Sequence, residues 1–283
     1  MAGIRVVTDS ACDLPPDLVT ELGIEIVPLT IRFGNEELVD RRDLSPKEFW
    51  SRMATSPVLP ETAAPSPGAF EEAYRNAKAD GADGIVCVTL SGALSATYQA
   101  AELAAKSVAD DIAVRVVDSR TVTLGEGLMA VAAARAAKQG KGLEDCVGVA
   151  EDLVGRTKVY GALDTMESLK KGGRVGSAQA LIGSMLSIKP IIQITADTNG
   201  LVEAESKQRT RSKSLRYLVE KVREHGQVED LAVMHGDAKD VEELLDLLGA
   251  VYPRDEILVG DIGPVIGTHG GPGVIGVVFH VPR

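Results

Sequence analysis

The chain has 283 residues, with 45% hydrophobic and 25% charged residues, which are the proportions of a folded globular protein and exclude a wholly disordered chain. The formal net charge is −11 at pH 7, and aromatic residues make up only 4%. This balance excludes a general role in binding nucleic acid or anionic lipid surfaces, because both partners are negatively charged.

Residues 1–160 alternate short apolar runs with helical patterns, as βαβ units do. The expected strands are 4–7, 24–31, 84–90 and 112–117. Helices are expected after the starts 13–16, 45–48 and 66–68, and over 97–108, 128–138 and 143–157. Pro28 bends the second strand or places it at an edge, because proline cannot donate a ladder hydrogen bond. This alternation predicts an α/β domain whose mostly parallel sheet is flanked by helices.

Residues 161–283 have a different rhythm, and a chain of this length forms about two domains. The expected strands are 188–195, 201–206, 231–234, 256–259 and 274–281, and the expected helices are 211–225 and 240–249. The turn 197–200 contains Asn-Gly between two strand patterns, which is typical of a hairpin. We therefore expect a second domain of the α+β class with a mixed or antiparallel sheet.

Cysteine usage and the absence of apolar segments bear on the compartment. Cys12, Cys87 and Cys146 are widely spaced, so the sequence predicts buried, reduced cysteines and no structural metal site. The first residues lack the apolar region of a signal peptide, and no run reaches the roughly 20 apolar residues of a membrane span. We expect a cytoplasmic protein, with no metal and no cofactor.

Loops that follow the predicted strands carry hydroxyl groups. In an open parallel sheet, ligands bind beyond the carboxyl ends of the strands. The best candidate is the loop 90–97, where Ser95 is expected to cap a helix and to leave the amides of Ala96 and Thr97 for an anion. The alternative is that Ser95 only caps its own helix.

Two further segments have the composition of a binding loop. Thr62 precedes the helix that Ser66 is expected to cap, so capping does not account for its hydroxyl. The run 263–273 is rich in glycine, which lets the backbone approach a ligand closely. His269 lies within this run and has few bulky neighbours in the sequence to pack against.

Other motifs carry less information. The run 271–276 matches G-x-G-x-x-G but is followed by a β-branched run, not by a helix, and the sequence has no phosphate-binding P-loop. A triad of Ser95, His269 and Asp118 can be written down, so a serine-type esterase stays open as an alternative. A sensor of small polar anions, with no lipid, is the other alternative.

Several of these segments together resemble the DegV family, the fatty-acid-binding subunits of bacterial fatty acid kinase. The resemblance extends over nearly the whole chain. It rests on these segments: 8–10 with 13–15, 62–67, 90–99, 118–119, 169–175, 188–190, Lys207-x-Arg209 and 262–276. Two segments depart from the usual family pattern, namely 91–97, which includes Gly92 and Ala96, and 62–65, which reads Thr-Ala-Ala-Pro.

The resemblance implies a DegV-like fold of two domains, 1–160 and 161–283, that hold one long-chain fatty acid in a tunnel between them. It assigns the carboxylate to Thr62, Ser95, the amide of Ala96, and His269. It places Arg174 and Arg209 near the mouth of the tunnel, facing the carboxylate or a partner. Further contacts are expected from Ser10, Ser91 and Gly270.

The resemblance also implies how such a protein works. The chain itself would do no chemistry, and a separate ATP-dependent kinase subunit would convert the bound fatty acid into an acyl phosphate. We further expect a monomer that contacts membranes only transiently.

Overall fold

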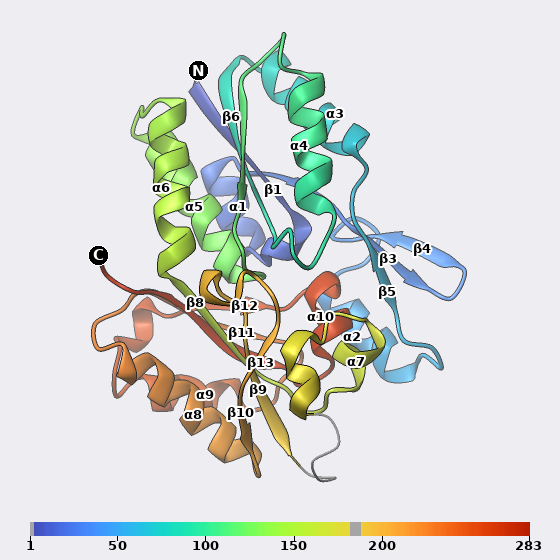
Figure 1. Cartoon of the computed structure of the whole chain (residues 1–283), viewed down its shortest axis with the longest axis vertical. Coiled ribbons are helices and arrows are strands. Elements are labelled where there is room, and N and C mark those ends of the chain that lie inside the picture. Colours follow the sequence, from blue (N-terminus) through green and yellow to red (C-terminus); the bar gives the residue numbers. More distant parts are fainter. Residues whose placement is uncertain (1–2, 182–187) are drawn as a thin grey trace.

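The structure is a computed structural model, and it describes residues 3–181 and 188–283 (Figure 1). A parallel sheet in the order β2-β1-β6-β7 forms the centre of the N-terminal half. Its strands are β1 (Gly3–Asp9), β2 (Glu25–Val27), β6 (Ala82–Thr89) and β7 (Val114–Asp118). The predicted parallel sheet is confirmed, because each of these pairs is parallel.

Helices cover both faces of this sheet (Figure 1). Helices α3 (Pro67–Ala79) and α4 (Thr97–Ser107) pack on one face, and α5 (Leu124–Lys138) and α6 (Leu143–Arg156) pack on the other. Successive side chains of β6 point alternately into the two apolar layers, with Ile85 in one and Val86 in the other. Burial on both faces is the reason that β6 is a continuous apolar run in the sequence.

The first helix, α1 (Pro16–Leu22), and a small antiparallel sheet complete this half. The small sheet has the order β4-β3-β5, with β3 (Thr30–Phe33), β4 (Glu36–Val39) and β5 (Glu61–Ala63). The single strand expected over 24–31 is therefore wrong: β2 and β3 belong to different sheets, and Pro28 lies between them. The reason is that proline cannot continue a ladder.

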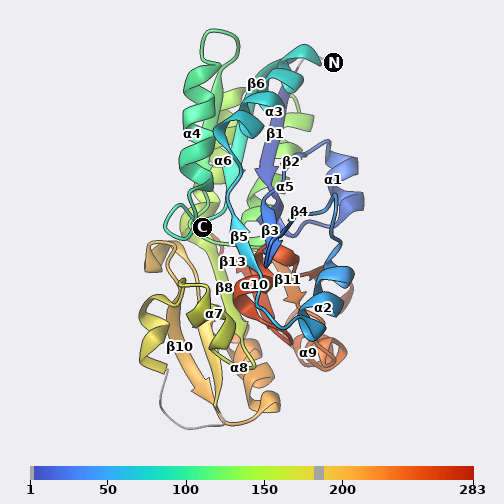
Figure 2. The ribbon, with the colours of Figure 1, turned by 90° about the vertical axis from the view of Figure 1, so that its right-hand side faces the viewer.

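Helix α2 (Pro46–Thr55) begins as predicted. Ser45 accepts a hydrogen bond from the amide of Glu48, and the Glu48 carboxylate accepts one from the amide of Ser45. Figure 2 shows α2 lying beside the lower half of the molecule, close to α10. This helix therefore belongs to the N-terminal part of the sequence but packs against the C-terminal part.

The C-terminal half contains a mixed sheet in the order β10-β9-β8-β13-β11-β12, in which only β11 and β12 are parallel neighbours. Its strands are β8 (Thr157–Ala162), β9 (Lys189–Gln193), β10 (Glu203–Gln208), β11 (Glu229–His235), β12 (Leu258–Asp261) and β13 (Ile275–His280). The expected mixed sheet and its β9–β10 hairpin are confirmed. The division into domains at residue 160 stays a prediction; strand β8 of this sheet spans that residue.

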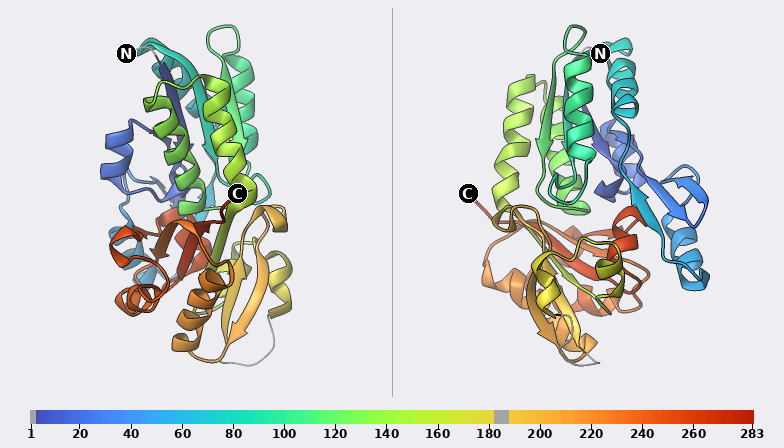
Figure 3. Two further views of the ribbon diagram at one scale, coloured as in Figure 1. Left: turned by 90° about the vertical axis from the view of Figure 1, so that its left-hand side faces the viewer. Right: turned by 45° about the vertical axis from the view of Figure 1, so that its right-hand side comes forward.

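Helices α8 (Arg211–Glu224) and α9 (Val241–Leu248) cover the outer face of the mixed sheet, where Val277 and its neighbours form a separate core. The inner face, which includes Val159 and Val278, joins the core of the N-terminal half. Figure 3 shows the mixed sheet below the parallel sheet and its helices. Two short helices flank this junction, α7 (Glu167–Lys171) and α10 (Pro264–Gly270). The glycine-rich run that we expect to be a loop thus begins as a helix, with Pro264 in its first turn.

Cys12, Cys87 and Cys146 are buried and form no disulfide, as predicted. In the part of the chain that the structure describes, no helix has both the length and the apolar character needed to cross a bilayer.

Candidate functional site

A cavity of about 220 Å³ lies between the mixed sheet and the strand ends of the N-terminal half. Most of its wall is aliphatic. The aliphatic side chains are Leu29, Ala64, Leu90, Leu94, Ala96, Val122, Val159, Leu163, Leu169, Ile192, Ile194, Val202, Met234, Ile262, Val265, Ile266 and Val274. Such a wall binds an apolar molecule through removal of its surface from water.

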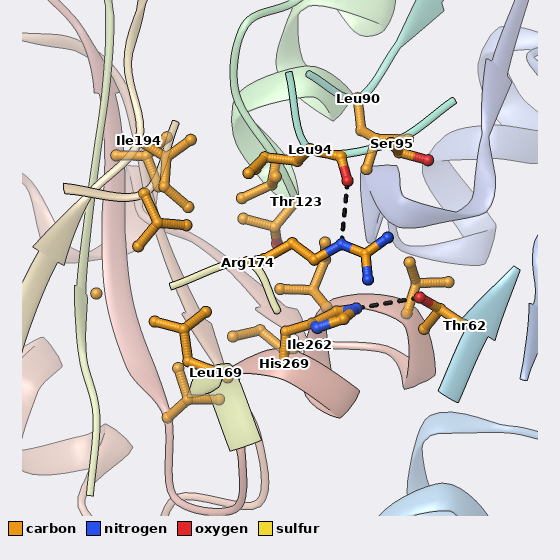
Figure 4. A pocket seen from close by; sticks show the side chains of 18 of the residues that line it. Thr62, Leu90, Leu94, Ser95, Thr123, Leu169, Arg174, Ile194, Ile262 and His269 are labelled. Atoms are coloured by element: carbon orange, nitrogen blue, oxygen red, sulfur yellow. Dashed lines mark hydrogen bonds between the residues drawn. The ribbon is translucent and has the colours of Figure 1, made fainter. Parts of the chain in front are cut away.

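Thr62 and His269 meet at one end of this cavity (Figure 4). Thr62 lies in β5 and His269 in the last turn of α10, and Thr62 Oγ1 is 3.0 Å from His269 Nε2. The two residues are 207 positions apart in the sequence. Only the docking of the two halves brings them together, so the sequence does not show this hydrogen bond.

His269 is a neutral histidine at pH 7. Burial, together with the smaller effect of the positive charge of Arg174, lowers its pKa to about 4. A methyl group at Gly172 would lie 2.2 Å from His269 Nδ1, so the missing side chain of Gly172 makes room for the ring. When His269 donates its Nε2 proton to Thr62, the hydroxyl proton of Thr62 is available to a ligand.

Ser95 and Ala96 line the cavity at the start of α4, close to Leu94 (Figure 4). The expected capping is partly wrong. Ala96 occupies the cap position, and Ser95 Oγ accepts from the Thr97 amide at 3.3 Å, so that amide is already occupied. The Ser95 hydroxyl also contacts Thr97 Oγ1 at 2.8 Å. Of the two expected amides, only that of Ala96 lacks a hydrogen bond to a described residue.

Arg174 lines the cavity and is also exposed to solvent, which is expected of a residue at an opening. Its Nε donates to the carbonyl oxygen of Leu94 at 3.3 Å and its Nη1 to that of Gly172 at 2.8 Å. In Figure 4 the guanidinium group lies between the Leu94–Ser95 segment and the Thr62–His269 pair. It therefore places a positive charge beside the hydroxyl groups at this end.

Helix α10 is held from the N-terminal half at its first residues. Asp13 Oδ1 accepts from the Gly263 amide at 2.9 Å, and Trp50 Nε1 donates to the carbonyl oxygen of Ile262 at 3.0 Å. A methyl group at Gly267 would lie within 2.8 Å of the Phe49 and Trp50 rings. These contacts fix the helix that carries His269.

Three predicted residues do not line the cavity in the described structure. The Ser10 hydroxyl accepts from the Leu29 amide at 3.0 Å, and the Ser91 hydroxyl donates to the carbonyl oxygen of Gly200 at 2.8 Å. Both are buried supports of the backbone. Arg209 is exposed between β10 and α8. Gly270 does line the cavity, as expected.

The three residues considered as a catalytic triad, Ser95, His269 and Asp118, have hydrogen-bond partners other than one another. His269 contacts Thr62, and Ser95 contacts Thr97. Asp118 Oδ1 accepts from the amides of Gly92 and Arg120 at 3.0 Å each. This arrangement does not form the relay from serine through histidine to aspartate that an esterase uses.

Asp13, which anchors α10, belongs to a buried acidic cluster with Asp9, Asp40 and Glu126, and Arg41 adjoins this cluster. Burial raises the pKa of Asp9 and of Asp40 to about 6, that of Asp13 to about 7, and that of Glu126 well above its usual range. Asp9 accepts from the amides of Ala11 and Leu90. Over residues 3–181 and 188–283, no group of three or more acidic, histidine or cysteine side chains could hold a metal ion.

Thr123 is a cavity residue that the sequence analysis missed. It is buried and has φ of 55° and ψ of −141°, which a β-branched residue rarely adopts. No sequence signal marks it, because a threonine before a helix usually caps that helix with ordinary angles. Thr123 thus adds a further hydroxyl-bearing residue to the cavity wall.

A family model described as "Uncharacterised protein, DegV family" matches residues 3–281. The chain belongs to the DegV family. A DegV domain-containing protein of Streptomyces coelicolor is 38% identical over 280 residues, which cover 97% of each chain.

Solved DegV structures share the whole fold. A DegV family protein from Thermus thermophilus, described by its fatty acid binding, has a TM-score of 0.90 and 33% identity and covers 99% of this chain and 100% of its own. DegV from Bacillus subtilis, described as a fatty acid binding protein, has a TM-score of 0.86, 29% identity and 100% coverage of both chains. The DegV fold expected from the sequence is therefore confirmed.

Proposed function

We propose that this DegV protein binds one long-chain fatty acid, with its acyl chain in the aliphatic cavity and its carboxylate at the end formed by Thr62, Ser95, Ala96 and His269. The observation that carries this proposal is the segregation of the cavity wall, in which these polar groups and Arg174 gather at one end (Figure 4). An amphiphile with one anionic head group has the same division. The DegV relatives described as fatty acid binding proteins support the assignment.

Two energy terms bear on this proposal, the burial of the acyl chain and the burial of the carboxylate. Burial of an acyl chain contributes about 0.8 kcal/mol per methylene, or on the order of 12 kcal/mol for roughly fifteen of them. Ordering of the chain and loss of its free motion offset much of this sum. The carboxylate needs hydrogen-bond donors, because burial without partners is costly. The hydroxyls of Thr62 and Ser95, the Ala96 amide and the Arg174 guanidinium supply them.

We further propose that the protein presents this carboxylate to a separate kinase. A carboxylate oxygen would attack the γ-phosphorus of ATP, the bond to the bridging oxygen would break, and acyl phosphate and ADP would form. Two observations favour a separate enzyme: the sequence lacks a P-loop, and the exposed Arg174 marks an opening at the head-group end. In this proposal the chain is a cytoplasmic, non-catalytic monomer that meets the membrane transiently.

The first test is denaturing extraction of the purified protein, with mass spectrometry of the released small molecules. We expect close to one fatty acid per chain. An extract without lipid, from protein that also takes up no added fatty acid, would contradict the binding proposal. A bound polar metabolite in its place would support the anion sensor, and labelling of Ser95 by a fluorophosphonate would support the esterase.

The kinase step has its own test. Protein loaded with fatty acid is added to ATP and an extract of the source cells, and hydroxylamine traps acyl phosphate as a hydroxamate. We expect hydroxamate only when loaded protein, ATP and extract are all present. Formation without the extract would show that the chain itself has kinase activity and would contradict a separate kinase.

A further inference from the structure

The floor of the cavity is the inner face of the mixed sheet, and one row across this floor lacks side chains at its centre. The strand register places Ile192 of β9 opposite Gly161 of β8, Gly161 opposite Gly276 of β13, and Gly276 opposite Met234 of β11. All four residues line the cavity. Two adjacent glycines are thus flanked by an isoleucine on one side and a methionine on the other.

Side chains also flank the glycine pair along the strands. Val159 on β8 and Leu163, directly after that strand, line the cavity two residues before and after Gly161, and Val274, directly before β13, does so two residues before Gly276. Neighbouring strands are about 4.8 Å apart, and residues two apart on a strand point to the same face. The glycine pair therefore forms a depression in the floor, enclosed by aliphatic side chains.

Different reasons account for the presence of glycine at positions 276 and 161. A methyl group at Gly276 would lie 2.5 Å from the carbonyl oxygen of Tyr160, so the fold requires glycine there. At Gly161 the nearest atom to such a methyl group is Ile192 Cγ1 at 3.5 Å, an ordinary contact. Gly161 does not have a positive φ, and glycine weakens a strand. The packing of the sheet therefore does not explain Gly161, whereas the space it opens in the cavity does.

Met234 borders the depression on the side of Gly276. Its terminal methyl would lie 3.1 Å from a methyl group placed on Gly276. Methionine is unbranched and changes rotamer at low cost, so it adapts to what lies beside it. The depression thus has one firm wall, Ile192, and one adaptable wall, Met234.

We propose that the Gly161–Gly276 depression selects fatty acids whose chain carries lateral bulk in its middle, through a cis double bond or a methyl branch. This inference rests on the proposed fatty acid binding. A straight chain that crosses the depression leaves a void, and the atoms around a void lose their dispersion contacts. A bent or branched chain fills the space and regains those contacts.

The test compares isomers that differ only in shape. Delipidated protein is titrated with oleic acid, with its trans isomer elaidic acid, with stearic acid, and with stearic acid that carries a mid-chain methyl branch. We expect oleic acid to bind roughly tenfold more tightly than elaidic acid, as a pocket discriminates about one methylene. The branched acid shows whether a branch provides the same gain over stearic acid.

Gly161→Ala places a methyl group in the depression. We expect it to reduce the preference for oleic over elaidic acid to about one, and to leave the binding of stearic acid unchanged or slightly tighter. Gly148→Ala on α6, where the added methyl has no neighbour within 4 Å, is the matched control and should retain the preference. Met234→Leu, which replaces the adaptable wall by a branched one, gives a second reading if Gly161→Ala folds poorly.

The outcomes separate the two proposals. Equal affinity of the wild type for oleic, elaidic, stearic and branched acids would overturn the role of the depression while fatty acid binding stands. The same conclusion follows if Gly161→Ala weakens oleic and elaidic acid by the same factor. If the wild type binds none of the four acids, the proposed function fails and this inference fails with it.

Discussion

Two polar regions of the molecule, the head-group end of the cavity and the buried acidic cluster, differ in what their side chains contact. The head-group end, with Thr62, Ser95 and His269, faces a cavity and has hydrogen-bond capacity to spare. The acidic cluster is buried, and two of its carboxylates, Asp9 and Asp13, accept backbone amides. The segment 90–97 of the first region follows β6, and Asp9 of the second ends β1, its neighbour in the parallel sheet.

The difference shows that a polar loop after a strand has two possible uses. The segment Thr8-Asp9-Ser10 has the composition of a ligand loop, yet its side chains support the backbone of Leu29, Ala11 and Leu90. The segment 90–97 faces the cavity instead. The sequence does not distinguish these uses, because what decides between them is the distant element that covers each loop.

The largest expected effect comes from the only cation adjoining the acidic cluster in the described structure. Arg41→Met removes that charge, and we expect a loss of about 5 kcal/mol of unfolding free energy at pH 8, where the three aspartates of the cluster are ionised. At pH 5 the loss should be smaller, because the carboxyls are then largely protonated. Urea unfolding at both pH values measures it. The exposed Arg42→Met is the control, and an equal loss at both pH values would contradict the account.

A smaller change of opposite sign is expected at Asp13. Because its pKa is raised to about 7, the folded chain keeps a proton there that the unfolded chain has lost above about pH 4. This group therefore lowers stability as the pH rises from about 4 to 7. Asp13→Asn, which can still accept from the Gly263 amide, should gain up to about 4 kcal/mol at pH 8 and almost nothing at pH 4. A gain that is the same at pH 4 and pH 8, or one matched by the exposed Asp110→Asn, would refute the buried charge as its cause.

At the head-group end the expected effect is on the ligand. The double variant Thr62→Ala/Ser95→Ala removes two hydrogen bonds to a carboxylate, worth about 3 kcal/mol together, and should weaken fatty acid binding roughly a hundredfold. Retention of a labelled fatty acid after gel filtration measures this. Thr55→Ala/Ser107→Ala, at two exposed hydroxyls, is the control. Unchanged retention in the first variant would refute the assignment of these residues.

The smallest effect tests the position of His269 alone. Gly172→Ala would place a methyl group 2.2 Å from Nδ1, so the ring must move away from Thr62. We expect roughly tenfold weaker fatty acid binding, which corresponds to one hydrogen bond of about 1.4 kcal/mol. Gly155→Ala on α6, where the added methyl has no neighbour within 4 Å, is the matched control. Full affinity in Gly172→Ala would show that the histidine does not contribute to head-group binding.

Much of the fold could be predicted from local patterns. The capping box at Ser45, the apolar run of β6 and the Asn-Gly turn after β9 each have a cause within a few residues, and the structure contains the expected elements. The short strands β4 and β5 were missed because three or four residues carry too little periodicity. Strand β8 was missed because the helical pattern of α6 continues in the sequence to Thr157, where the strand begins.

The site could be predicted less well. Hydroxyl-rich loops and the glycine-rich run mark Thr62, Ser95 and His269, and these three residues line one cavity. Gly161 and Met234 carry no such mark, since their place in the wall depends on strand register. The position of Thr123 in the wall depends on a strained backbone conformation, which the local sequence does not indicate. Their roles in binding stay predictions.

The hydrogen bond between Thr62 and His269 has a consequence for when the site can form during synthesis. Its partners come from β5 and α10, and the same helix is anchored through Asp13 and Trp50. A ribosome that has made the whole N-terminal half has therefore made no head-group site. If the chain binds a fatty acid as proposed, loading begins only after synthesis has passed α10, and a protein with an occupied cavity is one whose two halves have folded together.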